Sequence, residues 1–271
     1  MPELPEVETI RRELDRELPG LEVREIICKD ERLLKPDPEE VRDVVVGEKF
    51  EKVGRRAKLL IFRLSGSKNL LCHLRMSGRL LFRDESDPED KYVSVIFKLP
   101  KGKELRFASA RKFGYIKLAN NQTVEEILND YGPEPFKDLT LKKFKKIVSN
   151  SGAAVKNLLM DQKKIAGVGN IYANDALFLA KINPEKKAKQ LTDSQIENLY
   201  KSLEQVLKEG METGGASDQW YRDAYGRKGK YQRYFKVYGR AGETCSRCGG
   251  KIKRIKVGGR STFFCPHCQQ G

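Results

Sequence analysis

The sequence predicts an α+β protein of two domains: an N-terminal β-sandwich with a leading helix, and a C-terminal helical domain that ends in a small cysteine-rich hairpin. Three observations predict this fold. Strand-length segments rich in Val, Ile, Leu and Phe, separated by turn residues, fill positions 21–118. Helical spacing of apolar residues dominates from about position 120. Four of the six cysteines lie within positions 245–268.

The elements follow in order along the chain. Pro5 suits the first turn of a helix over Leu4–Leu18, whose apolar residues recur at helical spacing. Strands are then expected at Leu21–Cys28, Lys49–Leu64, Asn69–Arg83, Tyr92–Leu99, Glu104–Phe107 and Gly114–Leu118. Helices are expected at Thr123–Asp130, Leu141–Ser149, Ala153–Met160, Asn170–Ala180 and Ser194–Met211. Breaker residues within 120–135 mark the boundary, which predicts domains 1–130, 131–240 and 241–271.

The charge distribution indicates a polyanionic partner. The chain carries a formal net charge of +15. Positions 221–271 hold 13 Lys and Arg against 2 Asp and Glu, whereas positions 1–220 hold 40 against 36. A basic C-terminal part on a nearly neutral body is typical of a nucleic-acid-binding surface.

The sequence gives no sign of a membrane segment. No apolar run approaches the roughly 18 residues that a membrane span needs, and the N-terminus alternates Pro and Glu where a signal peptide would be apolar. We therefore expect a cytoplasmic protein with reduced thiols, in which Cys28 and Cys72 are inert core residues.

Two C-x2-C pairs near the C-terminus predict one structural zinc ion. They occupy positions 245–248 and 265–268 and consist of Cys245, Cys248, Cys265 and Cys268. Four thiolates close a tetrahedral site and leave no open position, so the zinc is expected to fold a hairpin over Lys251–Phe264 that turns at Gly258-Gly259. Two disulfides are the alternative, which a reducing compartment disfavours, and His267 is expected to be a bystander. The hairpin places Arg260 at its tip.

The N-terminus offers a candidate nucleophile. Removal of the initiator Met would leave Pro2 with a free secondary amine, and an α-amino group titrates near pH ~8, so that part of it is neutral at pH 7. Attack of such an amine on a sugar C1′ gives an iminium ion that accepts electrons during β-elimination. Glu3 is placed to donate a proton. From chemistry alone, an ordinary frayed terminus is the simpler interpretation.

Six motifs in the same order resemble the bacterial formamidopyrimidine-DNA glycosylase family. They are Met1–Thr9 (MPELPEVET), Arg55–Lys58 (RRAK), His73–Gly78 (HLRMSG), Arg111–Gly114 (RKFG), Gly167–Ala173 (GVGNIYA) and the cysteine hairpin with Gly259–Phe263 (GRSTF). The related endonuclease VIII enzymes typically open with Pro-Glu-Gly-Pro-Glu instead. The resemblance spans essentially the whole chain.

The resemblance implies a bifunctional enzyme, a DNA N-glycosylase and abasic-site lyase that removes oxidised purines such as 8-oxoguanine and formamidopyrimidines from duplex DNA. It also implies a helix–two-turn–helix motif in the helical domain. Pro2 would form the Schiff base, Glu3 would be the essential acid, and Glu6 a supporting carboxylate. Lys58 would transfer protons in β-elimination, and Arg260 would bind phosphate and take part in δ-elimination.

Further residues are implied to contact DNA. Met76, Arg111 and Phe113 resemble the residues that enter the duplex where the damaged base leaves, with Arg111 facing the orphaned cytosine. Candidate phosphate ligands are His73, Tyr92, Lys156 and Asn170. Asn170 has support of its own, because the glycines just before it free the backbone at a helix start, where anions bind. The structural alternatives are ordinary core packing for Met76 and Phe113 and a solvated side chain for Lys156.

Several positions depart from the family pattern. Ser109 stands where the family often has Asp, which removes a possible partner of Arg111, and Tyr92 stands where many members have His. Ser151 replaces a common basic residue. Positions 217–232 match loosely the loop that closes over an everted 8-oxoguanine. We expect a monomer acting on damaged double-stranded DNA. The alternatives are an endonuclease VIII-like enzyme for oxidised pyrimidines and a DNA-binding zinc protein without catalysis.

Overall fold

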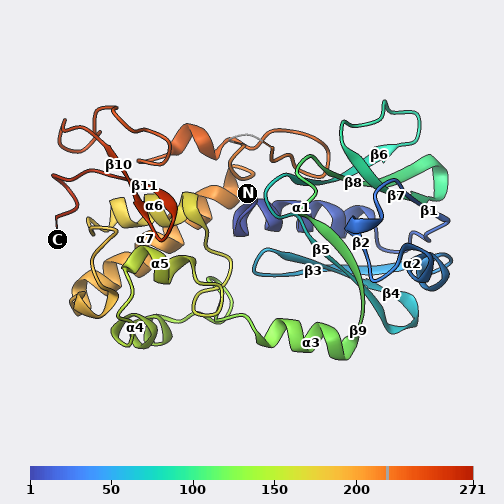
Figure 1. Ribbon diagram of the computed structural model, residues 1–271, viewed down its shortest axis with the longest axis horizontal. Coiled ribbons are helices and arrows are strands. Elements are labelled where there is room, and N and C mark those ends of the chain that lie inside the picture. The colour runs from blue at the N-terminus through green and yellow to red at the C-terminus, as the bar shows by residue number, and fades with distance from the viewer. Residues whose placement is uncertain (218–219, 271) are drawn as a thin grey trace. The chain divides into compact units, whose positions relative to one another are not determined.

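The computed structural model describes residues 1–217 and 220–270 and divides into two compact units (Figure 1). The first unit combines Met1–Asn129 with Thr213–Gln232, and the second combines Asp130–Glu212 with Arg233–Gly271. This division differs from the expected domains at two places: the segment 213–232 clusters with the N-terminal unit, and the expected third domain, 241–271, clusters with the helical unit.

The first unit begins with helix α1 (Leu4–Glu17), as predicted. Pro5 lies in its first turn, where a missing amide hydrogen costs nothing, and Glu3 with Glu6 forms a capping box. The helix buries Val7, Ile10 and Leu14 completely in the core that it shares with the strands.

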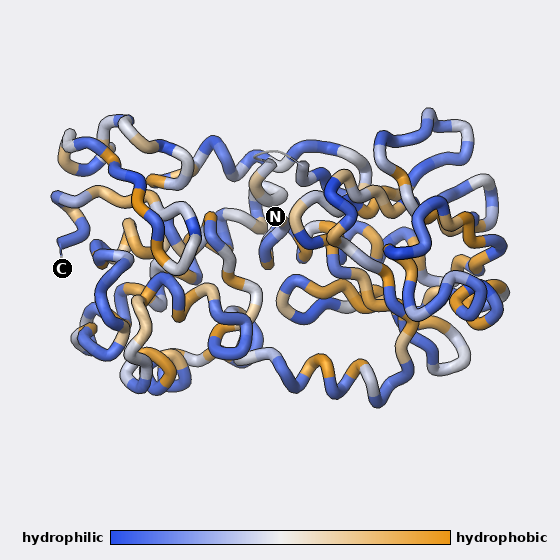
Figure 2. The backbone as a smooth tube through the Cα atoms, in the orientation of Figure 1, coloured by the Kyte–Doolittle hydropathy of each residue, from blue (hydrophilic) through white to orange (hydrophobic). Residues whose placement is uncertain are grey.

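Two sheets form the sandwich that the sequence predicts. One has the order β1 (Glu25–Cys28), β7 (Val93–Leu99), β8 (Lys103–Ser109), β6 (Gly78–Asp84) and is antiparallel. The other has the order β2 (Leu34–Lys35), β9 (Tyr115–Asn120), β5 (Lys68–His73), β4 (Leu59–Leu64), β3 (Phe50–Arg56), with only β2 and β9 parallel. Apolar residues from both sheets meet in one core, and Figure 2 shows the orange tube concentrated along these strands.

Two of the expected strands are broken by short connections that carry candidate site residues. The segment expected at 49–64 turns at Ala57 and Lys58 between β3 and β4, and Ala57 has a positive φ of 52°. The segment expected at 69–83 turns at 74–77 between β5 and β6. A Cβ on Gly78 would lie 2.3 Å from the carbonyl oxygen of Leu74, so this tight turn requires glycine.

A short helix, α2 (Pro38–Val45), is absent from the sequence prediction. Asp37 caps it by accepting hydrogen bonds from the amides of Glu39 and Glu40, and Pro38 occupies its first turn. The signal of a capping residue followed by Pro was present in the sequence.

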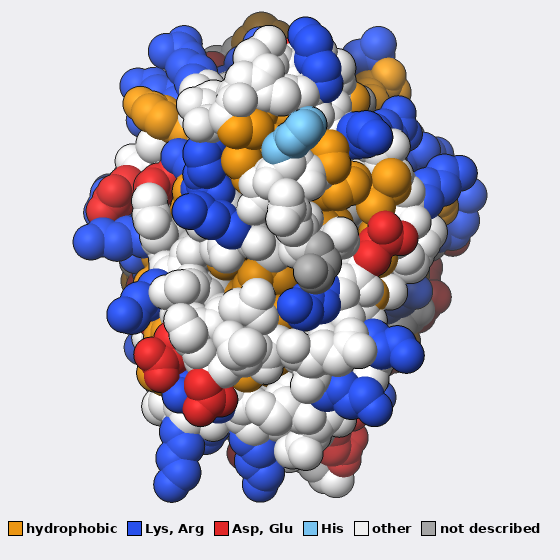
Figure 3. Space-filling view, turned by 90° about the vertical axis from the view of Figure 1, so that its left-hand side faces the viewer, with side chains coloured by type: hydrophobic (Ala, Val, Ile, Leu, Met, Phe, Trp, Pro, Cys, Tyr) orange, Lys and Arg blue, Asp and Glu red, His pale blue; other side chains and the backbone are white. Residues whose placement is uncertain are grey.

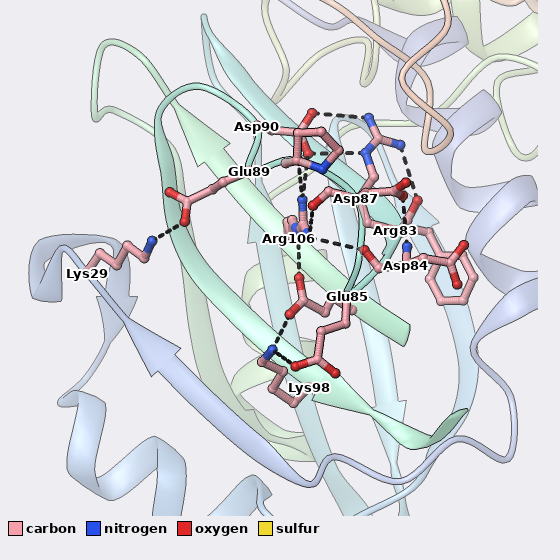
Figure 4. Close-up of polar contacts among 12 residues, drawn as sticks. Lys29, Arg83, Asp84, Glu85, Asp87, Glu89, Asp90, Lys98 and Arg106 are labelled. Atoms are coloured by element: carbon pink, nitrogen blue, oxygen red, sulfur yellow. Dashed lines mark hydrogen bonds and ion pairs between the residues drawn. The ribbon is translucent and has the colours of Figure 1, made fainter. Parts of the chain in front are cut away.

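Ion pairs fix the connection between β6 and β7 (Figure 4). Arg106, on β8 and almost fully buried, pairs with Glu104 and donates hydrogen bonds to the carbonyl oxygens of Asp84, Asp87 and Pro88. Arg83 pairs with Asp90 at 3.1 Å. A buried guanidinium needs such partners, so Arg106 holds the carbonyl groups of this connection in place.

The second unit is helical, as expected, with α4 (Leu141–Ser149), α5 (Val155–Met160), α6 (Asn170–Leu179) and α7 (Asp193–Glu212). Helix α3 (Asn121–Asn129) ends the N-terminal stretch of the first unit. No helix among the described residues is long and apolar enough to cross a membrane. The second unit also contains the hairpin of β10 (Lys253–Val257) and β11 (Arg260–Phe264), which turns at Gly258 and Gly259 as predicted.

Candidate active site

The N-terminus of α1 presents the candidate nucleophile. Pro2 and Glu3 are buried, whereas Met1 is 49% exposed. The amide of Glu3 donates to Oε2 of Glu6 at 2.7 Å, which fixes the extended backbone just before the helix. An acidic side chain beside a helix N-terminus is stabilised by the helix dipole. Pro2 and the Glu3 carboxyl are therefore held next to each other on an ordered part of the chain.

Glu6 connects the start of α1 to a second segment of the chain. Its second oxygen, Oε1, accepts a hydrogen bond from the amide of Ala216 at 2.7 Å. A Cβ on Gly215 would lie 2.8 Å from Cγ of Glu6, so only glycine lets the backbone approach the carboxylate this closely. With both oxygens accepting backbone hydrogen bonds, Glu6 fastens residues 215–216 to the start of α1.

The segment 220–227 is fastened along the same helix. The amide of Ala224 donates to Glu13 at 2.8 Å, and the hydroxyl of Tyr225 donates to Glu17 at 2.7 Å. Asp218 and Gln219, which belong to the expected lesion-closing loop, lie outside the described residues.

Lys58 is largely buried in the β3–β4 turn. Arg55 holds this turn, since its guanidinium donates to the carbonyl oxygen of Ala57 at 2.9 Å and to Glu8 of α1 at 2.9 Å. Burial alone would raise the pKa of Glu8, but hydrogen bonds from Arg11 and Arg55 outweigh it and lower the pKa to about 2. Glu8 is therefore ionised at neutral pH and ties the Lys58 turn to α1.

His73 ends β5, beside Leu59 of the neighbouring strand. Burial, together with the charges of Arg75 and Lys58, lowers the pKa of His73 to about 3. Its Nδ1 accepts a hydrogen bond from the amide of Arg75 at 3.1 Å. The ring is therefore neutral at physiological pH and orders the turn that leads to Met76.

Met76, Arg111 and Phe113 come together on two adjacent turns, which we call the finger (residues 74–77 and 110–113). The amide of Arg111 donates to Oγ of Ser77 at 2.8 Å, and Nη1 of Arg111 lies 3.4 Å from the Met76 sulfur. Met76 is 38% and Phe113 62% exposed. The alternative of core packing is wrong for both residues, because core side chains of this size are buried.

Tyr92 stands in the turn just before β7 with a positive φ of 70°. Its exposed ring meets Trp220 edge to face, with centroids 6.0 Å apart, and Nζ of Lys91 lies 5.0 Å from its centroid. Aromatic rings next to cations are common where proteins bind unpaired nucleotides.

The second unit contains the remaining candidates. Arg260 is exposed at the hairpin tip. Lys156, on α5, is 0% exposed and donates to the carbonyl oxygen of Ser261 at 2.9 Å and to Oγ1 of Thr262 at 2.5 Å. Asn170, the first residue of α6, donates from Nδ2 to the same carbonyl at 3.1 Å. These three residues therefore gather at the hairpin turn, with Lys156 beneath it.

The four cysteine sulfurs form one cluster, all within 4.8 Å of one another. Cys248 and Cys265 are 3.5 Å apart, and Cys245 and Cys268 are 3.9 Å apart. A tetrahedral ion with Zn–S bonds of ~2.3 Å requires sulfurs about 3.8 Å apart, so the cluster fits one zinc ion. The side chains around it, Ile252 and Phe263 among them, form a small apolar core.

The surface toward the left of Figure 1 is strongly basic. Lys and Arg side chains outnumber Asp and Glu over the face that Figure 3 shows. Lys253, Arg254, Lys256 and Arg260 of the hairpin are exposed. This confirms that the basic excess of the C-terminal residues lies at the surface, where it can attract a polyanion.

Three family models match successive parts of the chain. They describe the formamidopyrimidine-DNA glycosylase N-terminal domain (residues 1–116), the formamidopyrimidine-DNA glycosylase H2TH domain (131–221) and a zinc finger found in FPG and IleRS (242–271). The formamidopyrimidine-DNA glycosylase of Pelotomaculum thermopropionicum is 42% identical, covering 100% of this chain and 99% of its own. That of Chloroflexus aurantiacus is 43% identical, with 99% and 98% covered.

The chain belongs to the formamidopyrimidine-DNA glycosylase family.

Solved structures of this family agree with the fold. The Lactococcus lactis Fpg bound to DNA with an abasic site is 38% identical, has a TM-score of 0.93 and covers 99% of this chain and 100% of its own. A MutM complex with DNA containing carbocyclic 8-oxo-G has a TM-score of 0.92 at 38% identity, with both chains fully covered. The family, the two-domain α+β fold and the single structural zinc site are thus confirmed.

Sequence reasoning missed the residues that support the site. Glu8, Glu13 and Arg55 are absent from the expected site residues, and their importance follows only from which segments they join. The sequence offers no signal for them, because Glu8 and Glu13 lie to either side of the apolar stripe of α1 and their burial appears only in the structure.

Proposed function

We propose that this chain excises oxidised purines from duplex DNA and then cleaves the strand at the abasic site, with Pro2 as the nucleophile. One observation carries the assignment of the nucleophile: Pro2 and Glu3 are held together at the capped start of α1 in a member of the formamidopyrimidine-DNA glycosylase family. The rigid support of this N-terminus favours a reacting position over a frayed end.

The chemistry requires the amine that removal of Met1 would expose. The Pro2 nitrogen attacks C1′ while the bond from C1′ to the damaged base breaks, and the electron pair leaves with the base. The departing base takes up a proton and the Pro2 nitrogen loses its own; the nitrogen lone pair then breaks the bond from C1′ to the ring oxygen O4′, which opens the sugar, and Glu3 supplies the proton that O4′ takes up. The resulting iminium ion withdraws electrons, so that loss of the 2′ proton expels the 3′ phosphate. Lys58, held beside α1 through Arg55 and Glu8, is the group assigned to proton transfer.

The DNA contacts divide between backbone and base. Arg260 and Asn170 are assigned to phosphates, and His73 and Tyr92 to the region next to the finger. Lys156 supports the hairpin instead, because its buried ammonium group donates to Ser261 and Thr262. Met76 and Phe113 refill the space left by the everted base, while Arg111 reads the base opposite the lesion.

Borohydride trapping tests the nucleophile. We expect one covalent crosslink between the untagged protein and a duplex with 8-oxoguanine, mapping to Pro2, and none with an undamaged duplex. A crosslink at a lysine side chain would contradict the assignment. A parallel reaction on a duplex with an oxidised pyrimidine tests the endonuclease VIII-like alternative. An enzyme of that kind would form the crosslink faster on the oxidised pyrimidine than on 8-oxoguanine.

The assembly and the location are part of the same proposal. The proposal includes a monomeric enzyme, and the relatives are bacterial, which supports action in the cytosol on the chromosome. Light scattering of the protein with and without a short duplex checks the first statement: a mass of two chains per duplex would overturn it.

A further inference from the structure

The finger is a strained structure that needs outside support. Lys112, between Arg111 and Phe113, has a φ of 54°, and Arg75 in the facing turn has a φ of 52°. A residue other than glycine in the left-handed region costs roughly 1 kcal/mol or more and persists only where its surroundings hold it. The contact of Arg111 with Ser77 holds one side of the finger.

Ser109 has no carboxylate that could form an ion pair with the basic residues of the finger. It lies just before the finger, and its amide donates to the carbonyl oxygen of Tyr92 at 3.0 Å. Its hydroxyl is buried, and among the described residues it has no hydrogen-bond partner. This position, where the family often has Asp, thus offers no charge to the arginine and lysine that follow it.

A carboxylate from elsewhere in the chain reaches the finger. Oδ2 of Asp30, in the turn after β1, lies 2.7 Å from Nζ of Lys112. Asp30 is only 10% exposed and also binds Arg32 through two hydrogen bonds of 2.8 Å. The hydrogen bonds from Arg32 and then Lys112 hold the pKa of Asp30 well below its usual range, so it stays ionised.

The turn that carries Asp30 is itself anchored. The amide of Lys29 donates to the carbonyl oxygen of Ser94 at 2.8 Å. The Lys29 ammonium pairs with Glu89 of the β6–β7 connection, which the Arg106 network fixes (Figure 4). The backbone at Asp30 is therefore held in place, and the ion pair with Asp30 restrains the side chain of Lys112.

We propose that Asp30 is a positioning residue for reading the base opposite the lesion, and that it takes over the support that Ser109 cannot give. By holding Lys112 in its left-handed conformation, it sets the directions of Arg111 and Phe113 on either side. The inference rests on the proposed role of Arg111. It implies that discrimination against a wrong opposite base depends on an ion pair that does not touch DNA.

The test measures single-turnover excision from matched duplexes with 8-oxoguanine opposite cytosine or adenine. Asp30→Asn should lower the cytosine-to-adenine rate ratio about two- to fivefold, the range that one partly exposed ion pair supports. Loss of a negative charge should at the same time leave overall DNA affinity unchanged or raise it. Lys112→Met should lower the ratio similarly, and the double variant should lower it no further than either single one.

Arg32→Gln is the matched control. Arg32 shares Asp30 but lies outside the finger and is 70% exposed, so this variant should keep the wild-type ratio. Thermal midpoints of all variants identify any general loss of fold, which would slow excision from both duplexes alike and leave the ratio unchanged.

Arg111→Ala separates the two possible failures. If it lowers the ratio while Asp30→Asn and Lys112→Met do not, Asp30 is not a positioning residue. If Arg111→Ala itself keeps the full ratio, the proposed role of Arg111 falls, and the role of Asp30 falls with it. A ratio that drops equally in Arg32→Gln would also overturn the proposal, because the pair with Lys112 would then not be the cause.

Discussion

The start of α1 and the β10–β11 hairpin hold their functional residues in different ways. Pro2 and Glu3 rest on a helix whose apolar side is part of the large sandwich core, and carboxylates fix their backbone. Arg260 sits on a short two-stranded hairpin, supported by a small apolar cluster, the thiolates and hydrogen bonds from Lys156 and Asn170. Short hairpins are marginally stable alone, so a metal replaces the core that the hairpin lacks. The position of Pro2, the proposed nucleophile, should therefore be independent of zinc, whereas the position of Arg260, the proposed phosphate ligand, should depend on it.

The largest effect should come from blocking the amine. A tag left on the N-terminus converts the Pro2 nitrogen into an amide, which has no basic lone pair for attack. We expect base release and strand cleavage to be lost while duplex binding survives, as measured by gel assays and fluorescence anisotropy. Cleaving the tag should restore activity. Equal nicking by tagged and untagged protein would refute the assignment to Pro2.

Zinc removal should break the hairpin and spare the sandwich. Four-cysteine sites supply roughly 10–16 kcal/mol of apparent binding free energy, which the metal-free segment lacks. A chelator should therefore lower DNA affinity before the N-terminal unit unfolds, as followed by anisotropy and by circular dichroism. Should affinity stay intact after the metal is gone, the hairpin is not the DNA clamp.

The ion pairs of Glu8 should make the stability of the first unit depend on pH. Its pKa is lowered to about 2 in the folded state, so its stabilisation is fully present above the ordinary value near 4.5 and is lost as pH falls toward 2. Glu8→Gln should cost about 2–3 kcal/mol in the free energy of unfolding at pH 7, and less than half of that by about pH 3. Urea titrations measure it. The exposed Glu51 provides a control, since Glu51→Gln should change little at either pH.

The smallest effect concerns a single phosphate contact. Arg260→Ala should flatten the slope of log affinity against log salt by about one unit and weaken binding to damaged and undamaged duplexes alike. The exposed Lys189 of the same unit is a charge-matched control, and Lys189→Ala should leave the slope nearly unchanged. If Arg260→Ala changes the preference for one opposite base, Arg260 reads a base and not the backbone.

The sequence predicted what local patterns encode. The apolar stripe and Pro5 indicated α1, the glycine pair indicated the hairpin turn, and the cysteine spacing indicated the zinc cluster. The break at Lys58 inside a continuous apolar run was missed, because a tight turn with a positive φ at Ala57 needs no Gly-Pro signal when tertiary contacts hold it. The break at 74–77 was missed although Gly78 marked it. Neither the segment of Asp30 nor that of Lys112 predicts the ion pair between them, because the two residues are far apart in the sequence. The sequence analysis therefore found only that Ser109 replaces an acidic residue near Arg111, and not that Asp30 supplies a carboxylate to the neighbouring Lys112.

The bond between Glu6 and Ala216 also has a consequence for the order of events during synthesis. The first unit is assembled from two stretches separated by Asp130–Glu212 of the second, so its N-terminus cannot reach its final contacts until Ala216 has left the ribosome. Translation proceeds at about 5–20 residues per second, which leaves the N-terminus without these contacts for roughly ten seconds or more. In the finished fold Pro2 is buried while Met1 remains exposed. The aminopeptidase that would remove Met1 and expose the proposed nucleophile therefore meets, on the nascent chain, an N-terminus that the contact between Glu6 and Ala216 does not yet hold.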